Sequence, residues 1–215
     1  MRLSTLVERV EKVARLHSFI ATGVKGYLNE AVLDAASQVL LPDLQSSENV
    51  RTHTNSYKVD MPDEYHRNLY FVSSDATDLE IKIFRTKTAL LRDHPRLETT
   101  GDVEAVCVSE KALHYNPIPS TADTLTLHYY RQPVEMTADT DEPDGIPAHL
   151  QDKLLVNYAL AKVFEPFEDN PLAAKLKSKH EGAYYSALVD TKTFVGDTDE
   201  GGPAYVRDLS DEFIS

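Results

Sequence analysis

Two kinds of hydrophobic periodicity alternate along the chain, and they predict helices at both ends with strands between them. From Leu3 to Ala14, apolar residues recur every three or four positions, and charged residues occupy the opposite face. This spacing is typical of an amphipathic helix. A second helix is predicted over Tyr27 to Leu41, because its apolar residues share one face and Pro42 would end it.

The first predicted helix also carries a sequence signature of a helix start. Thr5 and Glu8 have the spacing of a capping box, in which each side chain bonds a backbone N–H of the first turn. Gly23 and Gly26 then interrupt the chain before the second helix.

The period changes to two in the middle of the chain, from about Gln45. Short runs of alternating or continuous apolar residues are separated by Pro, Asp, Asn, Ser and Gly, which is typical of antiparallel strands. A single helical turn is expected between two of them, at 88–94. The pattern predicts about six strands and leaves open whether they form a barrel or a two-layer sandwich. The runs lie at 57–61, 69–72, 79–83, 103–108 and 125–130.

Helical periodicity returns after Pro143. The segment Ala148 to Phe167 carries two apolar stripes, so this helix is either central to a bundle or part of a subunit contact. Asn170 and Pro171 fit the N-cap and first residue of a fourth helix. The candidate subunit-interface residues are Leu150, Leu154, Leu155, Tyr158, Val163 and Phe167. The apolar face expected for the fourth helix comprises Leu172, Leu176, Ala183, Tyr184, Ala187 and Leu188.

The segment from Phe194 onward differs from the rest in composition. It is rich in Gly and acidic residues, which disfavours a helix, yet it also carries large apolar side chains. Such a segment docks either on a partner or as a strap across its own core, and the sequence leaves both open. The candidate docking residues are Phe194, Tyr205, Val206, Leu209, Phe213 and Ile214.

These patterns together predict an α+β fold. N- and C-terminal segments form a helical bundle, an antiparallel β-rich sandwich or barrel is inserted between them, and an extended tail follows. The expected boundaries are 1–45 for the first helices, 46–142 for the inserted module, 143–193 for the last helices, and 194–215 for the tail.

Charge and composition narrow the classes of function. The 215 residues carry a net charge of −13, which disfavours a protein that grips nucleic acid but suits a surface that must not adhere to it. No apolar run approaches the length of a membrane span, and no secretory signal is visible. The one cysteine, Cys107, cannot form an internal disulfide framework. We therefore expect a soluble intracellular protein.

No motif for catalysis or metal binding is found. The eight histidines show no H-E-x-x-H pair, and an EF-hand read from Asp139 fails at Pro143, Asp144 and Leu150. There is no nucleophile elbow and no glycine-rich phosphate loop, and Cys107 lies in an apolar strand. We expect no cofactor, no metal and no enzymatic activity, although catalytic groups can assemble from distant positions.

The order of several motifs resembles the head-to-tail adaptor (connector) proteins of tailed bacteriophages. The resemblance runs from about Tyr27 to Leu188 and is strongest from Leu125 to Asp169, where a strand ending in Tyr-Tyr-x-x-Pro leads through an acidic turn into a helix. The β-rich middle is longer than in purely helical adaptors, which leaves the subgroup open. The motifs read GYLNEAVLDAA, YKVDMPDEYHRN, LHYNPIPSTADTLTLHYYRQPVEMT, ADTDEPDGIP and AHLQDKLLVNYALAKVFEPFED.

The resemblance implies a structural virion protein located in the head–tail neck and assembled in the host cytoplasm. Such adaptors form a homo-oligomeric ring, commonly a dodecamer, beneath the portal protein, with a tail or neck protein on the other side. DNA passes through the lumen without specific binding, and no membrane is involved. By the same resemblance the C-terminal segment reaches the portal, with Tyr205, Phe213 and Ile214 as anchors.

Three other functions are compatible with parts of the sequence. The protein could be another tail-completion or baseplate component. It could be a carbohydrate-binding β-sandwich framed by helices, although it lacks the tryptophans that sugar platforms favour, and strand geometry places Tyr129 and Tyr130 on opposite faces. It could also be a small hydrolase, which would need a pocket that the sequence does not reveal.

Overall fold

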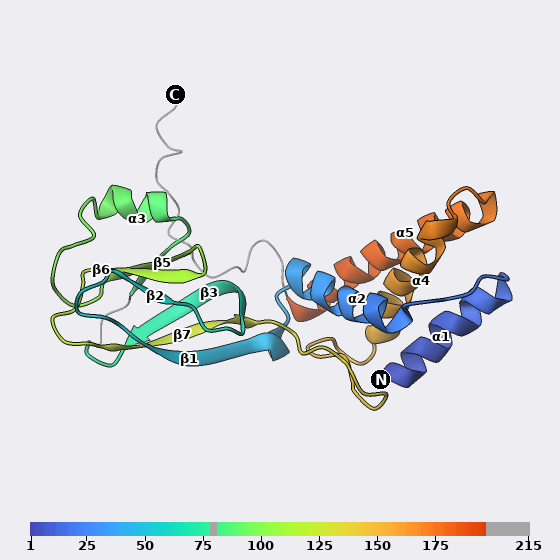
Figure 1. The fold of residues 1–215 in the computed structure, drawn as a ribbon, viewed down its shortest axis with the longest axis horizontal. Helices are drawn as coiled ribbons and strands as arrows, with labels where there is room; N and C mark the ends of the chain where they lie inside the picture. The colour runs from blue at the N-terminus through green and yellow to red at the C-terminus, as the bar shows by residue number, and fades with distance from the viewer. Residues whose placement is uncertain (78–80, 197–215) are drawn as a thin grey trace, which may run out of the picture. The chain divides into compact units, whose positions relative to one another are not determined.

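The computed structural model describes residues 1–77 and 81–196 and divides into two compact units (Figure 1). Among these residues, the helical unit comprises 1–44 and 132–196, and the β-rich unit comprises 45–77 and 81–131. The fold is therefore α+β, and the helical unit is built from the two ends of the described chain.

The helical unit contains the helices that the periodicity predicts, with shifted ends. α2 begins three residues earlier than expected and ends at Gln38. The predicted helix over 148–167 is continuous from Gln151 but starts with a π-helical turn and ends in a 3₁₀ turn. The elements are α1 (Leu3–Leu16), α2 (Val24–Gln38), η1 (Pro42–Leu44), η2 (Asp152–Val156), α4 (Asn157–Phe164), η3 (Glu165–Phe167) and α5 (Pro171–Val195).

The helix ends contradict one predicted cap and confirm another. The capping box at Thr5 is wrong, because α1 already begins at Leu3 and its N-cap, Arg2, makes no side-chain cap bond. Asn170 is confirmed as the N-cap of α5, since its side chain accepts a hydrogen bond from the N–H of Leu172. Pro171 follows as the first helical residue, where its missing N–H costs nothing.

α4 is the central helix of the helical unit. It packs against α1, α2 and α5, so its two apolar stripes are covered by helices of the same unit. Ala159, Leu160 and Phe164 are buried there. The Phe164 ring lies edge-on to Phe19 with centroids 5.3 Å apart, and it stacks on His180 at 5.9 Å.

The link after the last strand belongs to the helical unit rather than to the β-rich module in which the sequence placed it. The N–H groups of Leu3 and Ser4 donate to the carbonyls of Asp141 and Asp139, which satisfies two donors of the first turn of α1. Asn29 exchanges hydrogen bonds with the backbone of Met136. Backbone groups that the turn-rich composition did not reveal therefore fix residues 136–141 against the helices.

Seven strands form two sheets in the β-rich unit (Figure 1). One sheet has the order β1-β7-β3 and the other β2-β6-β5-β4. Two strands were not predicted: β1, which is almost entirely polar, and β6, which is buried throughout and shows no alternation. The strands are β1 (Gln45–Arg51), β2 (Lys58–Asp60), β3 (Tyr65–Ser74), β4 (Lys82–Phe84), β5 (Ala105–Ser109), β6 (Ala112–Asn116) and β7 (Thr124–Arg131).

The sequence led us to expect purely antiparallel sheets, and this expectation is wrong for one of them. β4 pairs with β5 in parallel, so the four-stranded sheet is mixed. The connection between them contains α3 (Lys87–Asp93), and a crossover of this kind is what a parallel pair requires. The expected helical turn at 88–94 is thus a two-turn helix, capped by Thr86.

The strands of the described residues form two separate sheets and no closed barrel. One core contains buried side chains from both sheets, among them Leu69 and Leu127 from one and Val106 and Tyr115 from the other. Tyr129 is part of this core, whereas Tyr130 lies on the opposite face of β7, as strand geometry predicts. α3 adds a small second cluster around Leu90 and Cys107.

Candidate interaction surfaces

Most of the predicted subunit-interface residues form the interior of the helical unit. Leu150, Leu154, Leu155 and Val163 are buried against neighbouring helices of the same unit. A buried side chain offers no surface to a second copy of the chain. Of the two explanations that the stripes allowed, the central position in a bundle accounts for these four residues, and the interface prediction for them is corrected.

Phe167 and Tyr158 keep an accessible part. Phe167 is 40% exposed at the end of the 3₁₀ turn η3 and packs its ring on Phe19, with centroids 5.1 Å apart. Tyr158 is half-buried, and its ring lies edge-on to Tyr184 at 5.1 Å. Of the six predicted interface residues, only these two can contribute to a contact between chains.

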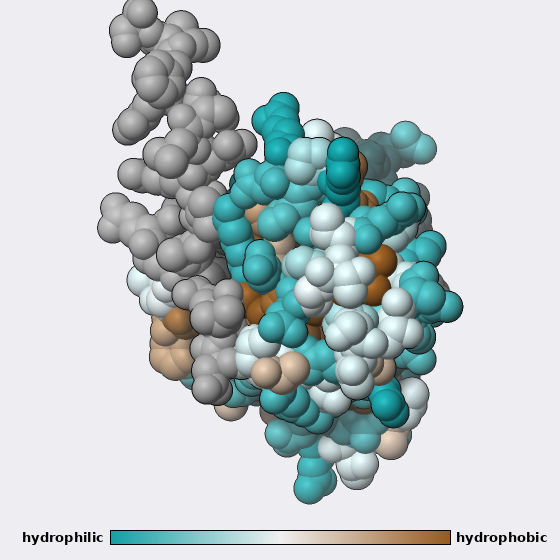
Figure 2. Space-filling view, turned by 90° about the vertical axis from the view of Figure 1, so that its left-hand side faces the viewer, coloured by the Kyte–Doolittle hydropathy of each residue, from teal (hydrophilic) through white to brown (hydrophobic). Residues whose placement is uncertain are grey.

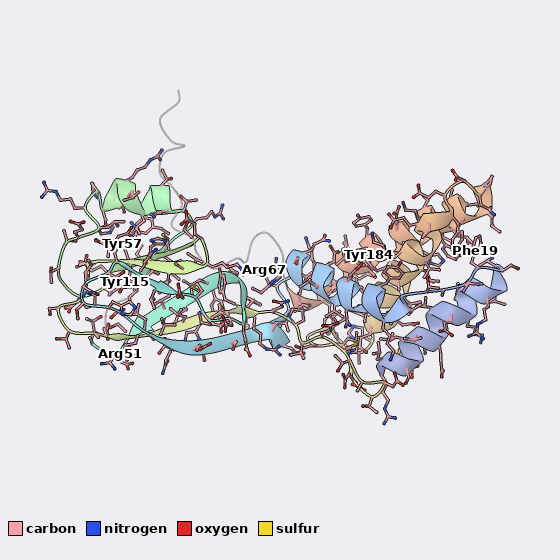
Figure 3. The ribbon with its side chains drawn as sticks, in the orientation of Figure 1. Phe19, Arg51, Tyr57, Arg67, Tyr115 and Tyr184 are labelled. Atoms are coloured by element: carbon pink, nitrogen blue, oxygen red, sulfur yellow. The ribbon has the colours of Figure 1, made fainter. Side chains whose placement is uncertain are left out.

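Apolar side chains gather at the tip of the helical unit, where α1 ends and η3 lies (Figure 3 labels Phe19 there). Ile20 is 78% exposed and Leu16 is 74% exposed. We call Leu16, Phe19, Ile20 and Phe167 the tip cluster. The sequence did not single out Leu16 or Ile20, because Leu16 lies off the buried stripe of α1 and Ile20 follows the helix.

A second exposed apolar pair lies on the outer face of α5. Tyr185 is 60% exposed and Val189 is 62% exposed, and their spacing of four residues places them side by side. Tyr185 lies about 20 Å along the helix axis from the start of α5, the end that adjoins η3. The tip cluster and the Tyr185–Val189 pair are therefore two different apolar surfaces of the helical unit, which also exposes Leu33, Val134, Leu172 and Phe194.

A charged cleft of about 230 Å³ lies between α2, α4 and α5. Lys177 is its electrostatic centre and forms ion pairs with Glu165, Glu168 and Glu181. The hydrogen bond and charge of Lys162 lower the pKa of Glu165, and Lys177 adds to this effect. The glutamates of these pairs are about half exposed and solvent screens their charges, so each pair contributes little to the stability of the unit.

Tyrosine side chains line this cleft. The hydroxyl of Tyr184 donates to a carboxylate oxygen of Asp34 on α2, which links α5 to α2. Burial and this hydrogen bond raise the pKa of Tyr184, and burial raises the pKa of Tyr158. Both phenols are therefore neutral at physiological pH. The lysines of the cleft already pair with its glutamates, so we assign the cleft a structural role.

The surface of the β-rich unit in Figure 2 is mostly hydrophilic, with small and separate hydrophobic areas. On the outer face of the three-stranded sheet the main exposed apolar side chain is Phe71, which packs its ring on His128 at 5.4 Å. Scattered apolar side chains of this kind are normal on a soluble domain. The larger apolar surfaces thus belong to the helical unit.

Comparison with known proteins identifies the chain. The family model described as "SU10 adaptor protein" matches residues 1–207. The chain belongs to the SU10 adaptor protein family. No curated protein matches it. The resemblance to phage head-to-tail adaptors that the motif order indicated is thereby confirmed.

Membership of this family implies a bacteriophage structural protein, a component of the virion that interacts with portal and tail proteins. An adaptor role favours a mechanical over a catalytic function. No helix among the described residues is long and apolar enough to cross a membrane.

Cys107 is buried, and this burial raises the pKa of its thiol to about 11, so it is protonated and inert at neutral pH. Within 1–77 and 81–196, no group of three or more His, Cys, Asp or Glu side chains could hold a metal ion.

The predicted docking residues of the C-terminal segment have separate outcomes. Phe194 lies inside α5, which continues to Val195, and its ring packs edge-on to His149 with centroids 4.5 Å apart. The expectation that helix ends before Phe194 is therefore wrong; the helix stops at Gly196, which adopts a left-handed conformation with φ 71°. The other five residues, Tyr205, Val206, Leu209, Phe213 and Ile214, lie outside the described residues.

Proposed function

We propose that the adaptor assembles into a closed ring beneath the portal, joins the capsid to the tail, and lets DNA pass through its lumen. By analogy with phage adaptors the ring contains twelve copies. The helical unit would form the frame of the ring, with the β-rich unit inserted into it, and the extended C-terminal segment would reach the portal.

The observation that carries this proposal is the pair of unlike apolar surfaces on one helical unit. A closed ring requires a heterologous contact, in which one surface of each copy meets a different surface of the next. The tip cluster and the Tyr185–Val189 pair on α5 are two exposed and unlike surfaces that could serve in such a contact. Their exposure costs free energy in an isolated chain, and that cost disappears when a neighbour covers them.

Charge supports the passage of DNA. The chain carries a net charge of −13, and a lumen lined by such subunits would repel phosphates rather than hold them. A duplex could therefore slide through the ring with little adhesion.

The proposal is tested by reconstitution. The purified chain, alone and mixed with the portal protein of the same phage, is analysed by native mass spectrometry and electron microscopy. We expect rings, either free or on the portal. A free monomer is compatible with the proposal if rings form on the portal. A chain that stays monomeric and leaves the portal unoccupied would contradict it, and saturable binding of a sugar would favour the carbohydrate-binding function.

A matched pair of variants tests the contact itself. Ile20→Asp places a charge in the tip cluster, whereas Thr22→Asp places the same charge on an exposed polar position two residues away. We expect Ile20→Asp to abolish ring formation and Thr22→Asp to leave it unchanged. Equal assembly of the two variants would remove the tip cluster from the interface.

The C-terminal segment is tested separately. Deletion of residues 197–215 leaves α5 and its Gly196 cap intact. We expect the truncated chain to fold but to lose binding to the portal. Unchanged portal binding would discard the assignment of this segment, without affecting the proposal of a ring.

A further inference from the structure

β1 forms an open edge of the three-stranded sheet. Within residues 45–77 and 81–131, the order β1-β7-β3 gives it one neighbour, β7, and the pairing covers all seven residues in one regular register. In Figure 1, β1 lies at the edge of the β-rich unit. In Figure 3 its last residue, Arg51, lies at the rim of this unit, whereas Tyr115 lies in its interior. Six of its seven residues are exposed or half-buried.

The hydrogen bonds next to β1 establish which backbone groups face outward. The N–H of Thr52, the residue after β1, donates to the carbonyl of Asp123 at 2.9 Å, in the same register. Because successive N–H groups of a strand point to opposite edges, those of Ser47, Asn49 and Arg51 point away from β7. Thr124, the partner of Arg51 on β7, agrees with this assignment. Its carbonyl accepts a hydrogen bond from the N–H of Asp75, the residue after β3, and therefore points away from β1.

These outward groups are available for pairing. Among the described residues, the backbone N–H groups of Ser47, Asn49 and Arg51 have no hydrogen-bond partner in the protein, and the three residues are exposed. Their donors and acceptors recur at every second residue, about 7 Å apart. An extended polypeptide strand matches this repeat and satisfies all of them at once.

Of the features that commonly protect such an edge, β1 carries one, the charge of Glu48 on the same face as the buried Val50. Proteins block edges with proline, lysine, bulges or charges that point inward. β1 contains no proline and no lysine, and its register shows no bulge. Its central charge, Glu48, accepts a hydrogen bond from the hydroxyl of Tyr129 at 3.2 Å, which holds the carboxylate on its own sheet.

Charge decides which strand fits. If two copies of β1 paired antiparallel along their whole length, Glu48 would face Glu48 of the other copy, and like charges in directly opposed positions destabilise a pair. A strand with a basic residue opposite Glu48 and an acidic residue opposite Arg51 would instead make two favourable cross-strand pairs. These positions are three residues apart and lie on opposite faces of the sheet.

We propose that the open edge of β1 binds an extended, antiparallel strand of a partner protein, in which an acidic residue precedes a basic residue by three positions. The site extends the sheet by one strand and uses the outward backbone groups of Ser47, Asn49 and Arg51 for affinity and the two charges for register. It is independent of the ring proposal, because it concerns the β-rich unit alone.

The test uses the full chain and two synthetic peptides. TETVKVT places its acid opposite Arg51 and its lysine opposite Glu48, and TKTVEVT has the charges exchanged. Amide shifts and hydrogen exchange of the isotope-labelled chain are followed by NMR during titration. We expect TETVKVT to protect the amides of Ser47, Asn49 and Arg51 and to bind about threefold or more tightly than TKTVEVT. Absence of protection, or equal affinity of the two peptides, would overturn the proposal.

A proline variant provides a second readout. Asn49→Pro removes one outward donor without breaking a backbone hydrogen bond to β7, and proline is tolerated at such edge positions. Asn49→Ala keeps the N–H and serves as the control for the lost hydrogen bond between Asn49 and Thr126. We expect only Asn49→Pro to lose peptide binding. If Asn49→Pro does not fold, the peptide comparison on the unmodified chain still decides. Protection of these amides in the chain alone, rising with its concentration, would assign the edge to a second copy and refute a foreign strand.

Discussion

His180 makes the stability of the helical unit sensitive to mild acid. The side chain is buried on α5, stacks on Phe164, and contacts Asn157 through Nδ1 at 2.8 Å. Because the Asn157 amide nitrogen donates to the carbonyl of Lys153, its oxygen remains to accept the Nδ1 proton. The other ring nitrogen, Nε2, has no hydrogen-bond partner among the described residues. Protonation would therefore place an unpaired N–H and a positive charge in the core.

The size of this effect follows from the pKa. Burial, with smaller contributions from the charges of Lys179 and His17, lowers the pKa of His180 from 6.5 to about 4. Below pH 6.5, His180 binds a proton in the unfolded chain, whereas in the folded chain it binds this proton only at about pH 4. Stability is therefore lost as the pH falls through this window, and the loss amounts to about 3 kcal/mol.

The assay is urea unfolding of the full chain between pH 7.5 and pH 4, compared with His180→Gln and with His149→Gln as a control at an exposed histidine. Carboxylates titrate in all three proteins, so the difference between their pH profiles isolates His180. We expect the profile of His180→Gln to be flatter than that of the wild type by about 3 kcal/mol, with no such change for His149→Gln. Parallel profiles for the wild type and His180→Gln would show that His180 does not cause the acid sensitivity.

The further predictions concern four single positions. Phe164→Ala, which leaves a cavity at the centre of the helical unit, should destabilise it by about 3–5 kcal/mol in the same urea assay, and a loss below about 1 kcal/mol would contradict the packing. Gly145→Ala should lower the thermal midpoint, because the φ of Gly145 is 74° and a Cβ would lie 2.7 Å from Leu44. Gly182→Ala on the open face of α5 should instead raise stability by about 0.5–1 kcal/mol. The opposite order of stability for these two variants would be inconsistent with both environments. Cys107 should resist a thiol reagent at pH 8 until the chain is unfolded, and rapid modification of the native chain would show that the thiol is accessible.

The elements with strong periodicity were predictable from sequence alone. The stripe of α1 and the Asn170–Pro171 start of α5 depend on interactions within a few residues, and the structure confirms both. β7 and β5 were recognised for the same reason, since alternation or a short apolar run reflects how a strand meets its core. The order of motifs was also sufficient to identify the adaptor family.

The candidate interaction surfaces were harder to predict from the sequence. The doubly apolar helix indicated a helix covered on two sides, but not whether the cover comes from α2 and α5 or from another copy. Leu150 and Leu154 proved to be internal, and the exposed apolar residues Leu16 and Ile20 belong to no periodic stripe. Exposure depends on which elements of the fold pack together, and the hydrophobic pattern of a single helix does not indicate its packing partners.

The helices, most strands, the acidic balance and the family could be predicted from the amino-acid sequence, because each depends on local spacing or overall composition. Four features became apparent only in the folded chain: the parallel pairing of β4, the pairing of the polar strand β1 with β7, the attachment of residues 136–141 to the helices, and which apolar side chains remain exposed. These features rest on backbone hydrogen bonds and packing between distant segments. Such contacts carry no side-chain signature, since every residue type offers nearly the same backbone groups.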